Sequence, residues 1–159
     1  CIIDPVMVST SGHVLLDAEA TDAMAHLISQ ATLVTPNLEE AAIMAGGHAS
    51  VEAMADQIMR LGCKAVLMKG GHAHGDLCED WLYQHGVAPQ CYSQPRLDTR
   101  HTHGTGCTLS AAIATCMGKG MTLAQAGEEG QAYVYQAILH APEFGNGHGP
   151  LGHAWPLHM

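Results

Sequence analysis

The order of structural elements is decided by the stretch Thr32-Leu33-Val34-Thr35-Pro36-Asn37-Leu38-Glu39-Glu40, in which a strand pattern gives way to a helix pattern. Residues 32–35 are β-branched or apolar and stop at Pro36, as expected of a short strand. From Leu38 to Ala45 the pattern favours a helix, which Gly46-Gly47 ends. A strand that leads directly into a helix is the repeating unit of an α/β fold.

Similar units lie on both sides of this stretch. Residues 1–5 are typical of the end of a buried parallel strand, and residues 17–29 have the apolar spacing of an amphipathic helix. On the other side, Ser50 can cap a helix that runs to Leu61, and residues 65–68 form another short apolar run. This alternation predicts parallel strands joined by helical crossovers, with functional loops at the carboxyl ends of the strands.

The pattern changes after residue 76. Short strands are expected around residues 80–83 and 90–94, with a turn at Gly86, which together predict an antiparallel hairpin at a sheet edge.

Two helices are expected after the hairpin. A glycine-rich turn leads into a helix over residues 107–116, and Thr122 with Gln125 forms the capping-box start of a last long helix. Residues 145–159 lack periodicity and are interpreted as a tail. No repeat or internal boundary is visible, so residues 1–159 are interpreted as part of a single domain.

Composition and charge exclude several classes of protein. The chain is 47% hydrophobic, enough for a sizeable core, but no run reaches the roughly 20 apolar residues of a membrane span and none suggests a signal peptide. The formal charge of −9, with only six Lys and Arg, opposes nucleic-acid binding. The six cysteines include no C-x-x-C pair, so we expect reduced thiols and a cytoplasmic location.

The 12 histidines raise the alternative of a metal-binding protein. His72 with His74, and His101 with His103, have a spacing that could share a metal. No third ligand follows at a recognisable spacing and there is no H-E-x-x-H motif, so this alternative ranks last.

The most informative segment for chemistry is His103-Gly104-Thr105-Gly106-Cys107-Thr108. Its glycines allow a tight turn and close approach to a ligand, and the helix that follows presents unpaired N–H groups at its positive end. Such amides can stabilise a phosphoryl group during transfer. Alternatively, the segment merely makes a turn.

Cys107 lies in the first turn of the expected helix. The helix dipole favours a thiolate there, which could accept a proton from an attacking hydroxyl. The alternative is a small buried core residue, and spacing alone favours that alternative.

Polar residues follow three of the expected strands. Asn37 and Glu40 offer oxygen ligands suited to magnesium, or else form an ordinary helix cap. Lys69 can contact a phosphate or lie in a surface turn, and Asp4 can be a carboxylate for magnesium or substrate, or simply a capping residue.

The order of these segments resembles a known family. The segments are Asp4-Pro5-Val6-Met7 with Ser11-Gly12, Thr35-Pro36-Asn37 with Glu40, Lys69-Gly70-Gly71-His72, residues 101–108, and Gly147-His148-Gly149-Pro150. In this order they look like the successive signatures of the hydroxymethylpyrimidine and phosphomethylpyrimidine kinases of thiamine biosynthesis, within the ribokinase superfamily. The resemblance runs through essentially the whole chain.

The resemblance implies a ribokinase-like, doubly wound, mostly parallel sheet flanked by helices, and a kinase that uses ATP and Mg²⁺. By this carry-over, Cys107 is the catalytic base and the glycine turn supplies anion-hole amides. The implied roles fall in three groups: catalysis by Cys107, Gly104, Thr105 and Gly106; nucleotide binding by Lys69, Asn37 and Thr108; and magnesium binding by Asp4 and Glu40. Residues near 121–132 and the terminal glycine segment would border the adenine.

The resemblance also implies a partial chain, because family members carry a large N-terminal portion before the segment equivalent to Cys1. The nucleotide half would be present and the acceptor half missing. The expected substrates are an aminopyrimidine alcohol and its phosphate, and family members are commonly homodimers. A pyridoxal kinase of the same superfamily and an inactive nucleotide-binding fragment remain alternatives.

Overall fold

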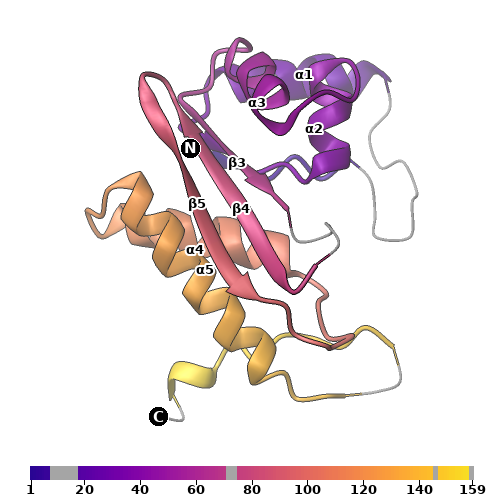
Figure 1. Ribbon diagram of the computed structural model, residues 1–159, viewed down its shortest axis with the longest axis vertical. Helices are drawn as coiled ribbons and strands as arrows, with labels where there is room; N and C mark the ends of the chain where they lie inside the picture. The colour runs from indigo at the N-terminus through magenta and orange to yellow at the C-terminus, as the bar shows by residue number, and fades with distance from the viewer. Residues whose placement is uncertain (8–17, 71–74, 145–146, 158–159) are drawn as a thin grey trace. The chain divides into compact units, whose positions relative to one another are not determined.

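The computed structural model describes residues 1–7, 18–70, 75–144 and 147–157 of the chain. Its strands are β1 (Ile2–Ile3), β2 (Leu33–Val34), β3 (Ala65–Lys69), β4 (Leu77–Gln84) and β5 (Val87–Pro95). Its helices are α1 (Ala18–Ser29), α2 (Leu38–Ala45), α3 (Val51–Met59), α4 (Thr105–Gly118) and α5 (Leu123–Leu139), with a short 3-10 helix, η1 (Trp155–Leu157). Figure 1 shows their course along the chain.

The strands form one mixed sheet in the order β1-β2-β3-β4-β5. β1 pairs with β2, and β2 with β3, in parallel, whereas β3 pairs with β4 antiparallel. α1 connects the first parallel pair, and α2 and α3 connect the second. The predicted α/β fold is therefore confirmed, with an antiparallel addition where the hairpin was expected.

The chain divides into two compact units, and each is described by itself. The first comprises residues Cys1–Ala73 and Glu79–Cys91, and the second comprises residues His74–Cys78 and Tyr92–Met159.

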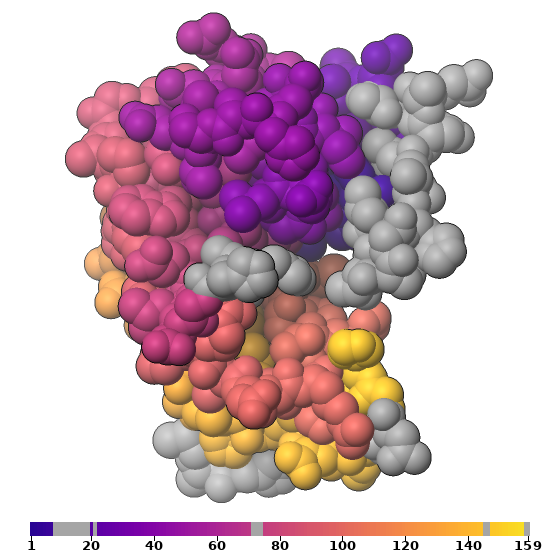
Figure 2. All heavy atoms as spheres, turned by 45° about the vertical axis from the view of Figure 1, so that its right-hand side comes forward, coloured from indigo at the N-terminus to yellow at the C-terminus, as the bar shows by residue number. Residues whose placement is uncertain are grey.

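The core of the first unit lies between α1, α2 and α3 and one face of the strands. All three helices contribute residues to this core, and α2 and α3 contact each other. Figure 1 shows the three helices beside β3, and Figure 2 shows the surface of this part of the chain in purple. Val66 and Met68 face this core from β3, while Ala65 and Leu67, which alternate with them, are also buried. A strand buried on both faces explains the unbroken apolar run in the sequence.

The second unit is built on α4 and α5, which pack against each other. At Gly130 a Cβ atom would lie 2.8 Å from Ile113 Cγ1, so glycine permits the close approach of the two helices. At Gly127 a Cβ would lie 2.6 Å from the Tyr92 hydroxyl oxygen, and that hydroxyl donates to the Ala124 carbonyl at 3.0 Å. Burial, followed by the nearby charge of Glu128, raises the pKa of Tyr92 to about 12.

Residues 147–157 of the expected tail are largely irregular, as the lack of periodicity indicated, but they contact α5. Leu151 is buried, Gly152 N–H donates to the Ala137 carbonyl at 2.8 Å, and η1 follows. Tyr133 donates its hydroxyl to the His153 carbonyl at 2.9 Å. These partners lie on α5, so no periodicity within the tail could have indicated them.

Several boundaries also differ from prediction. α4 begins at Thr105 rather than Cys107, because Gly104 takes a left-handed conformation (φ 84°) directly before it. α4 continues past residue 116 to Gly118, and α3 ends at Met59 rather than Leu61. Both hairpin strands are longer than expected, reaching outward to Leu77 and Pro95.

Other predicted boundaries hold. α2 has its predicted bounds, with Gly46 as its left-handed C-cap, and the caps at Ser50 and Thr122 are confirmed. The predicted start of the first helix at Asp17 lies outside the described residues. No helix of the described chain has the length and apolar character needed to cross a membrane.

Candidate functional site

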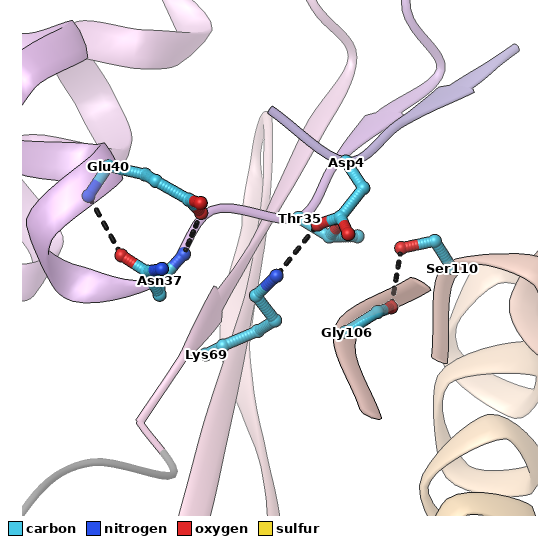
Figure 3. A network of polar contacts seen from close by, with 7 residues as sticks. All are labelled: Asp4, Thr35, Asn37, Glu40, Lys69, Gly106 and Ser110. Carbon is cyan, nitrogen blue, oxygen red and sulfur yellow. Dashed lines mark hydrogen bonds and ion pairs between the residues drawn. The ribbon is translucent and has the colours of Figure 1, made fainter. Parts of the chain in front are cut away.

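The first cluster of polar residues lies at the carboxyl ends of the parallel strands. Lys69 Nζ donates to Asp4 Oδ1 at 2.7 Å, and the Thr35 hydroxyl donates to the same oxygen at 2.9 Å (Figure 3). The side chains of Lys69 and Asp4 are 16% and 12% exposed. Because β1, β2 and β3 are parallel neighbours, their ends necessarily meet at one edge. The cluster thus joins residues far apart in the sequence.

Asn37 and Glu40 form a reciprocal cap at the start of α2. Asn37 Oδ1 accepts from Glu40 N–H, and Glu40 Oε2 accepts from Asn37 N–H, both at 2.8 Å. This is the capping role given above as the alternative to magnesium binding. The two roles are compatible, since a carboxylate has a second oxygen.

Glu40 is only 3% exposed, and burial is the main influence on its carboxyl group. Burial raises the pKa of Glu40, while the bond from Asn37 N–H and the charge of Lys69 lower it and the charge of Asp4 raises it. Two carboxylates therefore lie near a single lysine. An added cation would relieve both the burial penalty and the repulsion between Glu40 and Asp4.

The loop after β3 is held by Asp80, a residue that sequence reasoning did not select. Asp80 lies opposite Lys69 in the β3–β4 ladder, and its Oδ1 accepts from Gly70 N–H at 2.8 Å. A Cβ at residue 70 would overlap the Glu79 carbonyl oxygen, so glycine is required for this approach. Asp80 lies two residues before buried Leu82 and therefore on the same face of β4. This spacing in the sequence could have indicated that Asp80 is a buried carboxylate.

The second group of predicted residues is the turn at the start of α4. Gly104 is the N-cap, and no side chain caps the helix. Thr105 N–H donates to the Thr102 carbonyl at 3.4 Å, and Thr108 N–H makes the first bond along the helix, to Gly104. Within the described ranges, the N–H groups of Gly106 and Cys107 have no acceptor. Unpaired amides at the positive end of a helix are suited to an anion.

The side chains of this turn have separate roles. The Thr108 hydroxyl donates to the Gly104 carbonyl at 2.7 Å, and the Ser110 hydroxyl donates to the Gly106 carbonyl at 3.0 Å (Figure 3). Cys107 is exposed, which removes the buried-core alternative for this thiol.

The structure therefore brings the predicted residues together in two groups. Asp4, Asn37, Glu40 and Lys69 belong to the first unit, and the turn at residues 104–108 belongs to the second. Of the other residues selected from the sequence, Ser11, Gly12, Gly71, His72 and His74 lie outside the described residues. Across ranges 1–7, 18–70, 75–144 and 147–157, no three His, Cys, Asp or Glu side chains could hold a metal together.

Solved structures define the class of protein. The chain superimposes on the pyridoxal kinase from Staphylococcus aureus in complex with AMP-PCP with a TM-score of 0.84 and 32% identity, covering 96% of this chain and 57% of the other. For an ADP complex of Bacillus subtilis pyridoxal kinase the TM-score is 0.85, with 28% identity and coverages of 99% and 60%. The fold is thus the α/β fold of ribokinase-like proteins.

Within this class, the chain belongs to the phosphomethylpyrimidine kinase family, whose model matches residues 1–152. It is 45% identical over 160 residues to the hydroxymethylpyrimidine/phosphomethylpyrimidine kinase of Rhizobium meliloti (strain 1021) and 43% identical over 162 residues to that of Synechococcus elongatus. The matched regions include 96% and 98% of this chain, but only 60% and 61% of the length of the two relatives. The chain therefore spans about three fifths of the length of these relatives.

Proposed function

We propose that the protein containing this chain transfers the γ-phosphoryl group of ATP to the hydroxymethyl group of 4-amino-5-hydroxymethyl-2-methylpyrimidine, and then to the resulting monophosphate. The family match and the names of the relatives supply the reaction. The observation that carries the proposal is the turn before α4, where the Gly106 and Cys107 amides face no acceptor within the described chain.

The amides of the turn are proposed to stabilise the transferring phosphoryl group. Its negative charge spreads over three oxygens in the transition state, and fixed N–H donors need no rearrangement to meet that charge. Gly104 has a positive φ and no atom near the position of a Cβ, so a phosphate oxygen can approach the backbone. Thr105 and Gly106 would contribute the neighbouring donors.

Lys69 is proposed to contact the nucleotide phosphates. Its ammonium group is held at 2.7 Å by Asp4 and is partly exposed, so it is already directed and needs little ordering to bind an anion. Asn37 is placed beside it by a parallel bridge between residues 37 and 69. This bridge supports the assignment of both residues to nucleotide binding.

Asp4 and Glu40 are proposed to hold Mg²⁺, partly through water. The donor set fits, because Mg²⁺ in kinases uses one or two carboxylates together with waters and substrate phosphates. The pKa of Glu40 is raised, first by burial and further by the charge of Asp4. This is consistent with two carboxylates, Asp4 and Glu40, whose negative charge is not fully balanced by Lys69. When bound, Mg²⁺ would neutralise charge on the phosphates.

Cys107 is proposed to be the base. The substrate hydroxyl oxygen forms a bond to the γ-phosphorus, the bond to the bridging oxygen breaks, and ADP leaves. The hydroxyl proton passes to the Cys107 thiolate. The exposed position of Cys107 in the first turn of α4 supports this role.

The test is Cys107→Ala in the full-length protein, compared with Cys116→Ala on the same helix. Removal of a general base typically costs on the order of 10²–10⁴ in rate. We expect kcat to fall by at least about 10², with little change in the affinity for ATP, whereas Cys116→Ala keeps full activity. Unchanged kcat in Cys107→Ala would remove this residue as the base.

Pyridoxal phosphorylation is a second candidate, favoured by the similarity to pyridoxal kinases at TM-scores of 0.84 and 0.85. A coupled ATP assay with both acceptors separates the two functions through the ratio of their kcat/KM values. A protein that binds ATP with Mg²⁺ but phosphorylates neither acceptor would be an inactive nucleotide-binding module.

We also expect the protein to form a homodimer, which sedimentation equilibrium would measure.

A further inference from the structure

His101 is a buried histidine that the proposed chemistry does not use. It is 5% exposed and lies in the segment that leads into the turn before α4, ahead of His103 and Gly104. Its partner is in the C-terminal part of the chain: Gly149 N–H donates to His101 Nδ1 at 3.2 Å. In Figure 2 the yellow atoms of the C-terminal part lie beside the coral atoms of the segment around residue 100.

The contact with Gly149 fixes the proton on the His101 ring. Because a backbone N–H can only donate, Nδ1 of His101 must be the unprotonated nitrogen, and the proton of the neutral ring is on Nε2. Glycine is required at residue 149, since a Cβ there would overlap the imidazole ring. The contact therefore requires both the acceptor nitrogen of His101 and the absence of a side chain at Gly149.

A second contact joins the same two segments. His148 Nδ1 donates to the Arg100 carbonyl at 2.9 Å. Residues 148–152, here called the C-terminal strap, are anchored at their other end, where Gly152 N–H donates to the Ala137 carbonyl of α5 at 2.8 Å. Between the anchors, Leu151 is 5% exposed. The strap is therefore held at both ends, with Gly149 and Leu151 buried and Pro150 exposed.

The strap contacts continue into the turn before α4 through short backbone bonds. Thr102 N–H donates to the Arg100 carbonyl at 3.0 Å. The Thr102 carbonyl then accepts from the Thr105 hydroxyl at 3.2 Å and from the Thr105 N–H at 3.4 Å. Residues 100–102 thus link the strap to the first residue of α4.

We propose that His101, held by Gly149 of the strap, is a positioning residue that sets the orientation of the amides at the start of α4. This rests on the proposed function, in which those amides stabilise the transferring phosphoryl group. A displacement of about 1 Å in such a site can reduce the rate on the order of 10²-fold. His101 would therefore act on catalysis through the amides of the turn, by way of residues 100–102.

The test compares three variants of the full-length protein. Asparagine places an acceptor near the position of Nδ1, so His101→Asn keeps the bond from Gly149, whereas His101→Leu fills the space and removes the acceptor. Gly149→Ala displaces the ring from the other side. We expect kcat to fall about tenfold to a hundredfold in His101→Leu and Gly149→Ala, with an unchanged KM for the acceptor and with most activity retained in His101→Asn.

A readout that does not require activity separates this inference from the proposed function. In ¹H–¹⁵N spectra, the Gly104, Gly106 and Cys107 amide signals should shift in His101→Leu and stay near their wild-type positions in His101→Asn. Signals unchanged in a folded His101→Leu protein would overturn the positioning role, as would equal kcat in the leucine and asparagine variants. If the wild-type protein transfers no phosphate but these shifts occur, only the proposed function fails.

Discussion

The pair formed by Lys69 and Asp4 gives a stability prediction that can be worked from the structure. Lys69→Met keeps the length of the side chain and removes its charge, which leaves the Asp4 carboxylate with the Thr35 hydroxyl as its remaining described donor. Asp4→Asn makes the reciprocal change. The double variant replaces the ion pair with neutral groups, and the asparagine oxygen can still accept from Thr35.

The expected magnitude follows from the burial of the pair. Exposed ion pairs contribute about 0–1 kcal/mol, whereas removal of one partner from a buried pair costs about 3–5 kcal/mol. At 16% and 12% exposure, Lys69 and Asp4 are close to the buried limit. Because Thr35 still donates to Asp4, we expect Lys69→Met to lower the free energy of unfolding by about 3 kcal/mol. The double variant should recover most of that loss.

The assay is urea unfolding followed by the fluorescence of Trp81, in a Trp155→Phe background. Trp81 lies opposite Met68 in the β3–β4 ladder and packs against the core of the first unit, so its signal reports the unit that contains the pair. With a urea slope of about 2 kcal/mol/M, a loss of about 3 kcal/mol lowers the midpoint by about 1.5 M.

Two results would refute this reasoning. If the two single substitutions were additive in the double variant, the charges would not be coupled. If Lys69→Met lowered the free energy of unfolding by less than about 1 kcal/mol, the pair would behave as a solvated surface pair despite its burial.

For two further substitutions the structure predicts whether the protein becomes more or less stable. Burial raises the pKa of Glu40 above its ordinary value of 4.5, so the stability contributed by this group is full below pH 4.5 and is lost as the pH rises through the folded-state pKa. Glu40→Gln should therefore gain stability relative to wild type from about pH 4 to about pH 7, measured by urea midpoints, and parallel pH profiles would contradict this. Gly127→Ala would place a Cβ 2.6 Å from the Tyr92 hydroxyl oxygen, and we expect a loss of about 1–3 kcal/mol. Gly118→Ala has open space at its Cβ and serves as the control, since it should be neutral or stabilising.

Elements whose signals are local could be predicted from the sequence. The caps at Asn37, Ser50 and Thr122 each depend on residues within one helical turn, and all three are present. The buried run of β3 was equally clear, because a strand covered on both faces has no polar alternation. The end of α2 at Gly46 follows from the left-handed conformation that glycine adopts readily.

Contacts between distant residues could not be predicted in the same way. Asp4 and Lys69 were each selected, but their mutual bond depends on the meeting of parallel strand ends across 65 residues of sequence. Asp80 and His101 were missed as anchors, because their partners are backbone groups of Gly70 and Gly149, which leave no trace in side-chain spacing.

The C-terminal strap has a consequence for synthesis. His101 and Gly149 are separated by 48 residues, so at roughly 5–20 residues per second Gly149 is added about 2–10 seconds after His101. Before that time the nascent chain can fold the glycine turn only without the bond between Gly149 and His101. A product terminated upstream of Gly149 would contain all of residues 103–108 and still lack the bond between Gly149 and His101.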